Sequence, residues 1–158
     1  MKHPKIISTT NLLTKIMFGG EKLVFTNGCY DLFHAGHASL LSQIKAEFPD
    51  GYKIIVGVNS DKSVKLNKGP ERPIIPEEQR AFVVACHEAV DYVFVFNEPT
   101  VDGYLRWLKP DYWVKGGDYS VGTLHPAEKE ACGDHTQVMF IPLVDGISAT
   151  KIVERIAK

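Results

Sequence analysis

The chain has 158 residues, with 18 Lys and Arg against 19 Asp and Glu, which gives a formal net charge of −1. A domain of this length folds around one core without covalent cross-links, and the balanced charge excludes a broad basic surface for duplex nucleic acid. The 3 cysteines are odd in number and show no C-x-x-C spacing, so neither a disulfide framework nor a cysteine zinc site is indicated.

The predicted elements begin with a short helix near residues 12–18 that ends at Gly19-Gly20, so residues 1–20 form an N-terminal helical extension. Apolar runs rich in β-branched and aromatic residues then predict five strands buried on both faces. These runs are residues 23–25, 54–58, 92–96, 112–114 and 138–141. No run approaches the ~18 apolar residues that a membrane helix needs, so no export signal and no membrane span are expected. The cysteine usage predicts a reducing cytoplasm.

Helical patterns alternate with these strands. Apolar stripes at helical spacing are predicted at Leu40, Leu41, Ile44 and Phe48, and at Phe82, Val83, Cys86 and Val90. Residues 148–157 predict a last helix, capped by Ser148, whose Ile152, Val153 and Ile156 face inward. The polar stretches 60–72 and 116–130 are expected to be loops with at most a short helix. The alternation predicts a single α/β domain with a Rossmann-like, doubly wound, parallel five-stranded sheet.

Chemically active residues follow four of the five predicted strands. They occupy residues 26–37, 59–62, 115–119 and 145–151, and glycine, histidine, lysine and hydroxyl side chains recur among them. Because ligands of open α/β sheets bind beyond the carboxyl ends of the strands, we expect one phosphate site at this edge.

His34 and His37 are three residues apart, at the start of a helix expected to begin near Ala35. Free backbone N–H groups and the partial positive charge of a helix N-terminus suit polyphosphate, and each imidazole could donate a hydrogen bond or carry a proton there. Gly36 permits close approach of a ligand. Two alternatives remain open at this point: a helix-capping pair with satisfied rings, and a metal site with Asp31 as third ligand.

The cations Lys65, Lys68, Arg72 and Arg80 follow the second strand and could clamp a triphosphate, although Lys65 is better explained as solvated. Arg80 lies at the start of a helix, where the helix dipole disfavours a cation. A ligand or a carboxylate partner is therefore expected for its guanidinium.

The Lys115-Gly116-Gly117-Asp118 segment is either a simple turn or a place where a base or ribose approaches the backbone, with Asp118 accepting from hydroxyls. Ser148 and Thr150 are expected as helix caps, and a capped N-terminus is also an anion site. Packing roles are expected for three aromatic residues, Tyr30, Trp107 and Trp113. Cys29 has no adjacent base and is expected to fill space.

Residues 24–41, in which Asn-Gly-Cys-Tyr-Asp is followed by His-Ala-Gly-His, resemble the cytidylyltransferase-like branch of the HxGH nucleotidyltransferase superfamily. The resemblance covers almost the whole chain from about residue 21. It continues through Gly-Val-Asn-Ser-Asp at 57–61, Lys-Gly-Pro-x-Arg-Pro at 68–73, Glu-Gln-Arg at 78–80, Lys-Gly-Gly-Asp-Tyr at 115–119 and Gly-Ile-Ser at 146–148. One departure is visible: the usual Ile-Ser-Thr-Thr or Ile-Ser-Ser-Thr has Ala149 in place of the middle hydroxyl.

Within this superfamily, the segments 68–73 and 115–119 are similar to those of the adenylyltransferases of the ADP-heptose pathway. The resemblance implies transfer of AMP from ATP, carried with Mg²⁺, to D-glycero-D-manno-heptose 1-phosphate, by a homodimer. Alternatives are a cytidylyltransferase acting on glycerol 3-phosphate or another phospho-alcohol, and a nucleotide-binding module without chemistry. Pyrophosphate release in assays with both nucleotides and a panel of phosphorylated substrates would distinguish the three.

The motifs and the resemblance together assign roles for direct in-line transfer, with ATP and a sugar phosphate as partners and no metal-ligating side chain. His34, His37 and Lys68 are expected to stabilise charge on the transferring and leaving phosphates. The sugar phosphate is expected to contact Asn59, Asp61 and Arg72. The residues expected to bind nucleotide are Thr26, Asn27, Gly28, Cys29, Tyr30, Asp31, Gly36, Arg80, Lys115, Gly116, Gly117, Asp118, Ser148 and Thr150.

Overall fold

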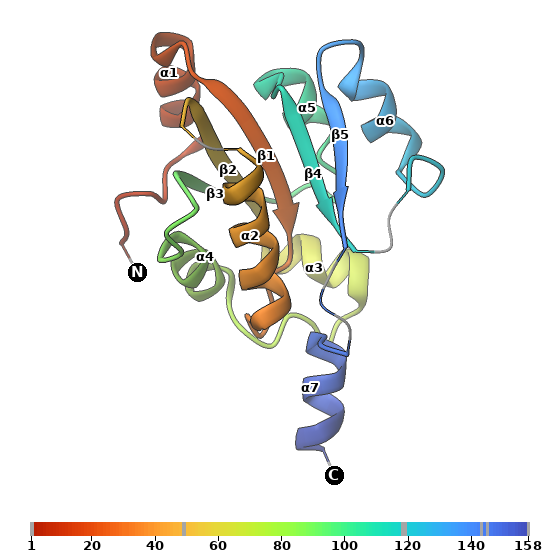
Figure 1. Cartoon of the computed structure of the whole chain (residues 1–158). Coiled ribbons are helices and arrows are strands. Elements are labelled where there is room, and N and C mark those ends of the chain that lie inside the picture. Colours follow the sequence, from red (N-terminus) through yellow and green to blue (C-terminus); the bar gives the residue numbers. More distant parts are fainter. Residues whose placement is uncertain (1, 49, 118–119, 143, 145, 158) are drawn as a thin grey trace.

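The computed structural model describes residues 2–48, 50–117, 120–142, 144 and 146–157. Five strands form one sheet in the order β3-β2-β1-β4-β5, and every neighbouring pair is parallel (Figure 1). The strands are β1 (Lys22–Gly28), β2 (Tyr52–Asn59), β3 (Tyr92–Phe96), β4 (Tyr112–Gly116) and β5 (Gln137–Ile141). The predicted Rossmann-like parallel sheet is confirmed.

Helices cover both faces of this sheet, as the doubly wound arrangement requires. They are α1 (Thr9–Gly19), α2 (Ala35–Glu47), α3 (Asp61–Lys68), α4 (Glu77–Ala85), α5 (Asp102–Leu108), α6 (Pro126–Cys132) and α7 (Ala149–Ile156). Side chains alternate along β1: Val24 packs into a core with α2 and α4, while Leu23 and Phe25 pack into a second core with α1, α5 and α6. Two cores, one on each face, therefore hold the sheet in place.

The chain order changes direction at β1. β2 and β3 extend the sheet on one side of β1, and β4 and β5 extend it on the other. The first crossover and the return to β4 therefore leave a crevice beyond the carboxyl ends of β1 and β4, which is the usual ligand site of such sheets.

The N-terminal extension is only partly helical. Ser8 caps α1 by accepting from the Asn11 N–H, and Gly20 ends it at φ 64°, where a side chain would be strained. Before α1, Ile6 forms a parallel bridge to Val93, and the Val93 N–H donates to the Lys5 carbonyl at 2.8 Å. This segment covers the outer edge of β3, which would otherwise expose unpaired backbone groups.

Three local predictions need correction. The stretch 60–72 is mostly α3, because the Ser60 hydroxyl caps it and Val64 is fully buried beneath it. α4 ends at Ala85 and buries Ala81, Val84 and Ala85, so Val83 and Cys86 of the predicted stripe are exposed, whereas Val90, beyond the end of the helix, is buried as predicted. By contrast, the stripe Leu40, Leu41, Ile44 and Phe48 is buried as predicted.

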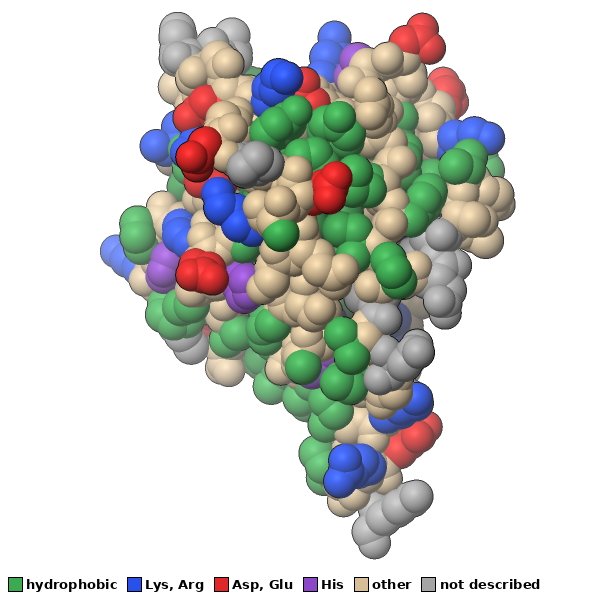
Figure 2. Space-filling model, in the orientation of Figure 1, with side chains coloured by type: hydrophobic (Ala, Val, Ile, Leu, Met, Phe, Trp, Pro, Cys, Tyr) green, Lys and Arg blue, Asp and Glu red, His purple; other side chains and the backbone are tan. Residues whose placement is uncertain are grey.

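The third correction concerns α7. Ser148 caps it as predicted, through a 3.2 Å hydrogen bond from the Lys151 N–H, but none of its described side chains is buried and Ile156 is 78% exposed. Figures 1 and 2 show α7 projecting beyond the carboxyl end of the sheet. Ile152 lines a pocket together with Phe33 and Val83, but the predicted stripe is not buried as a whole. The helix continues away from the sheet instead of returning across a face, so Ile152 and Val153 are only half-buried.

No helix among the described residues is both long enough and apolar enough to cross a bilayer.

Candidate active site

The two histidines of the HxGH sequence form the turn between β1 and α2. His34 is the N-cap of α2, and its Nδ1 accepts a hydrogen bond from the Gly36 N–H at 3.2 Å. The His34 N–H in turn donates to His37 Nδ1 at 3.3 Å. The rings stack with centroids 3.9 Å apart. The capping alternative is thus realised, and it places both rings at a helix N-terminus.

These hydrogen bonds decide where the imidazole protons reside. Because Nδ1 of each ring accepts from a backbone N–H, each neutral ring carries its proton on Nε2. Burial, followed by the charges of His34 and Lys68, lowers the pKa of His37 to about 4, and burial also lowers the pKa of His34. The pair is therefore neutral at neutral pH, and both Nε2–H groups are available to donate.

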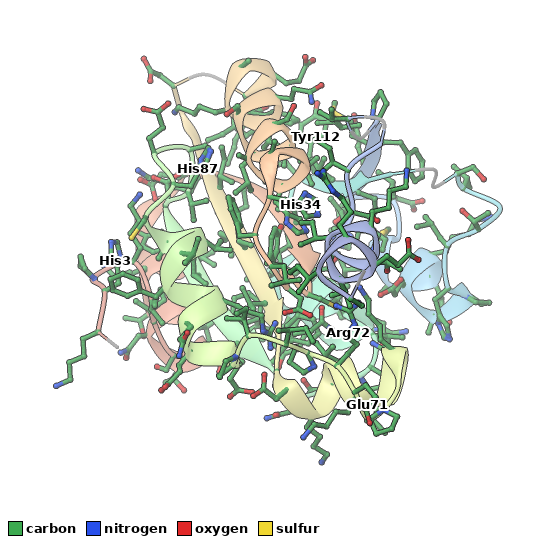
Figure 3. All side chains as sticks on the ribbon, turned by 90° about the horizontal axis from the view of Figure 1, so that it is seen from below. His3, His34, Glu71, Arg72, His87 and Tyr112 are labelled. Atoms are coloured by element: carbon green, nitrogen blue, oxygen red, sulfur yellow. The ribbon has the colours of Figure 1, made fainter. Side chains whose placement is uncertain are left out.

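A cleft of about 540 Å³ opens beside His37, at the carboxyl ends of β1, β2 and β4. Figure 3 looks at this end of the molecule and shows His34 and Arg72 there, on the side of the C-terminal helix. The predicted residues that line the cleft are Asn27, Gly28, Cys29, Tyr30, His37, Asn59, Lys68, Lys115 and Gly116. The structure therefore brings residues from four predicted motifs to one site.

Asp31 does not face this cleft. Its carboxylate accepts from the Ile74 N–H at 3.0 Å, the Ile75 N–H at 2.9 Å and Arg72 Nη1 at 3.2 Å. Burial alone would raise the pKa of Asp31, but these donors outweigh it and hold the pKa below its ordinary value. With both oxygens engaged by protein, Asp31 anchors the loop that carries Arg72, and the nucleotide contact predicted for Asp31 stays a prediction.

Arg80 is fully buried beneath the site. Its Nη2 donates to Asp61 Oδ1 at 2.8 Å, its Nε donates to the Ile75 carbonyl at 2.8 Å, and its Nη1 donates to the Cys29 carbonyl. The carboxylate partner expected for Arg80 is thus Asp61. The guanidinium joins three loops at the strand ends, and the phosphate contact predicted for it stays a prediction.

Several predicted site residues lie around the cleft rather than on its wall. Thr26 and Tyr30 are buried at the end of β1, where the Thr26 side chain lies close enough to act on the Tyr30 phenol. The Tyr30 ring supports His37 from 5.2 Å, and burial raises the pKa of its phenol. Thr150 is exposed on α7. Gly117 has φ 121°, which explains the glycine, whereas Asp118 lies outside the described residues.

Sequence reasoning missed one wall of the cleft. This wall comes from the end of α3, the loop after β3 and the start of α6, and consists of Asn67, Pro99, Thr100, Thr123, His125 and Glu128. The signal was the end of the third strand, which was the one strand end not considered. Glu128 also counters the effect of burial, which lowers the pKa of Lys115.

The metal alternative finds no support. Among residues 2–48, 50–117, 120–142, 144 and 146–157, no three His, Cys, Asp or Glu side chains are grouped so that they could hold a metal ion. Asp31, the third ligand considered, is engaged by the three donors described above.

Comparison with known proteins agrees with this geometry. The cytidylyltransferase-like family model matches residues 25–155. The bifunctional protein HldE of Helicobacter acinonychis is 42% identical over 158 residues, which are 99% of this chain and 32% of that protein. The bifunctional protein HldE of Alcanivorax borkumensis is 45% identical over 139 residues, which are 87% of this chain and 28% of that protein. The chain thus spans about a third of the length of these relatives.

Solved structures share the fold. A lipopolysaccharide core biosynthesis protein from Thermoplasma volcanium superposes with a TM-score of 0.64 at 25% identity, covering 80% of this chain and 100% of that one. A macrolide-efflux protein from Streptococcus pneumoniae has the same TM-score of 0.64 at 21% identity, covering 99% of this chain and 58% of that one, and supports the fold alone. From the family match, the identities and the HxGH geometry together, the chain belongs to the cytidylyltransferase-like family of nucleotidyltransferases.

Proposed function

We propose that the chain transfers AMP from ATP to D-glycero-D-manno-heptose 1-phosphate, giving ADP-heptose and pyrophosphate. The observation that carries the proposal is the neutral, stacked pair His34 and His37, with both Nε2–H groups available at the N-terminus of α2 beside the cleft. The similarity to the bifunctional HldE proteins and the motifs at 68–73 and 115–119 support the sugar phosphate as substrate.

The reaction needs no covalent enzyme intermediate. An oxygen of the sugar phosphate attacks the α-phosphorus of ATP, the new P–O bond forms, and the bond to the bridging oxygen of pyrophosphate breaks. Because the attacking oxygen of the sugar phosphate is already ionised, no general base is required. His34 and His37 donate to oxygens that gain charge in the transition state, and the α2 N-terminus and the ammonium of Lys68 add positive potential.

Mg²⁺ is proposed to enter with ATP. The ion is typically held by phosphate oxygens and water together with few protein ligands, which fits a site without a three-residue metal cluster among the described residues. Bound there, it would neutralise charge on the triphosphate.

A homodimer is proposed on the basis of α7. Its Ile152 and Val153 are only half-buried and its Ile156 is 78% exposed, and Figure 2 shows hydrophobic side chains continuing along one side of the projecting helix. Light scattering after gel filtration tests this: the wild-type chain should have twice the monomer mass, and Ile156→Glu should shift it towards the monomer. A wild-type monomer at micromolar concentration would contradict it.

A reducing cytoplasm is proposed as the compartment, supported by three free cysteines.

Pyrophosphate release tests the activity. ATP and CTP are each combined with heptose 1-phosphate, glycerol 3-phosphate and phosphoethanolamine. The proposal expects release with ATP and heptose 1-phosphate well above every other pair. Preference for CTP would favour the cytidylyltransferase alternative, and nucleotide binding without release under any pair would favour the binding module.

A further inference from the structure

Two asparagine side chains line the cleft, and each is held by a hydrogen bond to a neighbouring side chain. These bonds turn the amide nitrogen of one asparagine and the amide oxygen of the other towards the cleft. Asn27 ends β1 and Asn59 ends β2, and both belong to the cleft wall. An amide has a donor end and an acceptor end, so its orientation decides which ligand group it can bind. The orientation of Asn27 follows from an indole that can only donate, and that of Asn59 follows from a serine hydroxyl whose proton is already used by a carbonyl.

Asn27 is oriented by Trp113. The indole Nε1–H of Trp113 donates to Asn27 Oδ1 at 3.0 Å, and the tryptophan is fully buried. Because an indole N–H can only donate, the facing atom must be the amide oxygen. The Nδ2 group of Asn27 is left as a hydrogen-bond donor, which suits a phosphate oxygen.

Asn59 is oriented by a relay of the opposite sense. The hydroxyl of the fully buried Ser63 donates to the Glu98 carbonyl at 2.7 Å, and a carbonyl can only accept. With its one proton used, the Ser63 hydroxyl can only accept from Asn59, and it does so from Nδ2 at 2.9 Å. Asn59 Oδ1 is therefore the end turned towards the cleft.

The cleft-facing oxygen of Asn59 lacks a strong donor. Within the part of the chain that the structure describes, its contact is the Cys29 thiol at 4.0 Å, and a thiol is a weak donor. Asn59 is itself 95% buried, since its exposed fraction is 5%. An oxygen so placed repels the oxygens of a phosphate and binds a hydroxyl well. This part of the wall also contains two polar side chains and a cation, which are Asn67, Thr100 and Lys68. Polar side chains suit the hydroxyl groups of a sugar phosphate, and the cation suits its phosphate.

We propose that Asn59 is a specificity-determining residue that accepts a hydrogen bond from one sugar hydroxyl of the phosphorylated substrate, and that Ser63 is the positioning residue that holds it in this orientation. The inference rests on the proposed function and deepens it, because it assigns the β2 side of the cleft to a polyhydroxylated phosphate. The Nδ2 group of Asn27, at the end of β1, is assigned by the same inference to a phosphate oxygen of the bound substrates.

The test compares steady-state kinetics of Asn59→Ala and Ser63→Ala with the wild-type chain. Loss of this hydrogen bond should raise KM for the sugar phosphate by about tenfold in Asn59→Ala and by a smaller factor in Ser63→Ala. The kcat and the KM for ATP should change by less than about twofold in both, because the contact is uniform binding of the sugar. Thr136→Val is the matched control. Its hydroxyl also donates to a backbone carbonyl at 2.7 Å, but it lies at the opposite end of the sheet, so all three constants should stay unchanged.

Deoxy analogues of the sugar phosphate sharpen the result. One analogue should lose about tenfold in kcat/KM with the wild-type chain and show no further loss with Asn59→Ala, because protein and substrate then lack the same bond. Additive losses at every hydroxyl position, or a raised KM for ATP instead of the sugar phosphate, would overturn the inference and leave the transferase function intact.

If the wild-type chain does not turn over heptose 1-phosphate, the proposed function fails by itself. Calorimetric titration with heptose 1-phosphate and with glycerol 3-phosphate then decides the role of Asn59. A weaker affinity in Asn59→Ala supports the inference. Equal affinities, or no binding of either compound to the wild-type chain, refute it.

Discussion

The neutral state of His37 should make the stability of the protein depend on pH between neutrality and pH 5. Burial, assisted by His34 and Lys68, lowers the pKa of His37 to about 4 from its ordinary value of 6.5. Below pH 6.5, His37 is therefore protonated in the unfolded chain but stays neutral in the folded chain until the pH approaches 4. Stability from this group is fully present above pH 6.5 and is lost progressively as the pH falls towards 4.

The size of the effect follows from the same two pKa values. Between pH 7.5 and pH 5.0 this difference corresponds to a loss of about 2 kcal/mol in the free energy of unfolding. Asp31 contributes little in this window, since its pKa is held below the ordinary value of an aspartate, which already lies under pH 5. His34 acts in the same direction as His37, so a variant is needed to separate the two.

Urea unfolding of the wild-type chain and of His37→Asn at pH 7.5 and pH 5.0 provides the measurement. Asparagine keeps an oxygen that can accept from the His34 N–H but does not titrate in this range. The wild-type chain should lose about 2 kcal/mol more than the variant between the two pH values. Identical losses in the two proteins would show that His37 is not held neutral by the fold, and would remove the argument for its Nε2–H as a donor.

Three further outcomes are expected. His37→Ala should lower kcat by about 100-fold or more and change ATP affinity far less, as pyrophosphate release and calorimetry would show, because the contact strengthens in the transition state; equal losses in both would count against this role. Asp31→Asn should lower the free energy of unfolding in urea by about 2–4 kcal/mol, because an amide has only one accepting oxygen for the donors that now share two carboxylate oxygens, namely the Ile74 N–H, the Ile75 N–H and Arg72 Nη1. A loss below about 0.5 kcal/mol would contradict the anchoring role. Gly36→Ala should reduce kcat, since a Cβ there meets the His34 ring at 3.0 Å, whereas Gly103→Ala, in a helix with nothing within 4 Å, should leave kcat unchanged and add up to about 1 kcal/mol of stability. An unchanged kcat in Gly36→Ala would show that the ring position does not matter.

Local sequence patterns predicted most of the fold and the centre of the site. The strands were recognised as short apolar runs, and the histidine turn was recognised because an N-cap and a nearby glycine act within four residues of each other. The positions of these motifs at strand ends then followed from the general architecture of parallel sheets. Patterns at the protein surface were less informative: Val83 and Cys86 of the stripe predicted in residues 82–90 are exposed, because α4 turns the small residues Ala81 and Ala85 together with Val84 towards the core instead.

What the sequence determined by itself, therefore, was the five strands, their parallel arrangement and the residues gathered at the carboxyl edge, since all of these depend on chain neighbours and periodicity. The helix α5 and the order of the strands in the sheet came only from the structure. The tertiary structure alone decided the partners of Asp31, whose donors lie more than 40 residues further along the chain, and the direction of the amides of Asn27 and Asn59. It also decided that α7 leaves its apolar side chains unburied. Each of these depends on groups distant in the sequence, and the direction of an amide changes neither composition nor spacing.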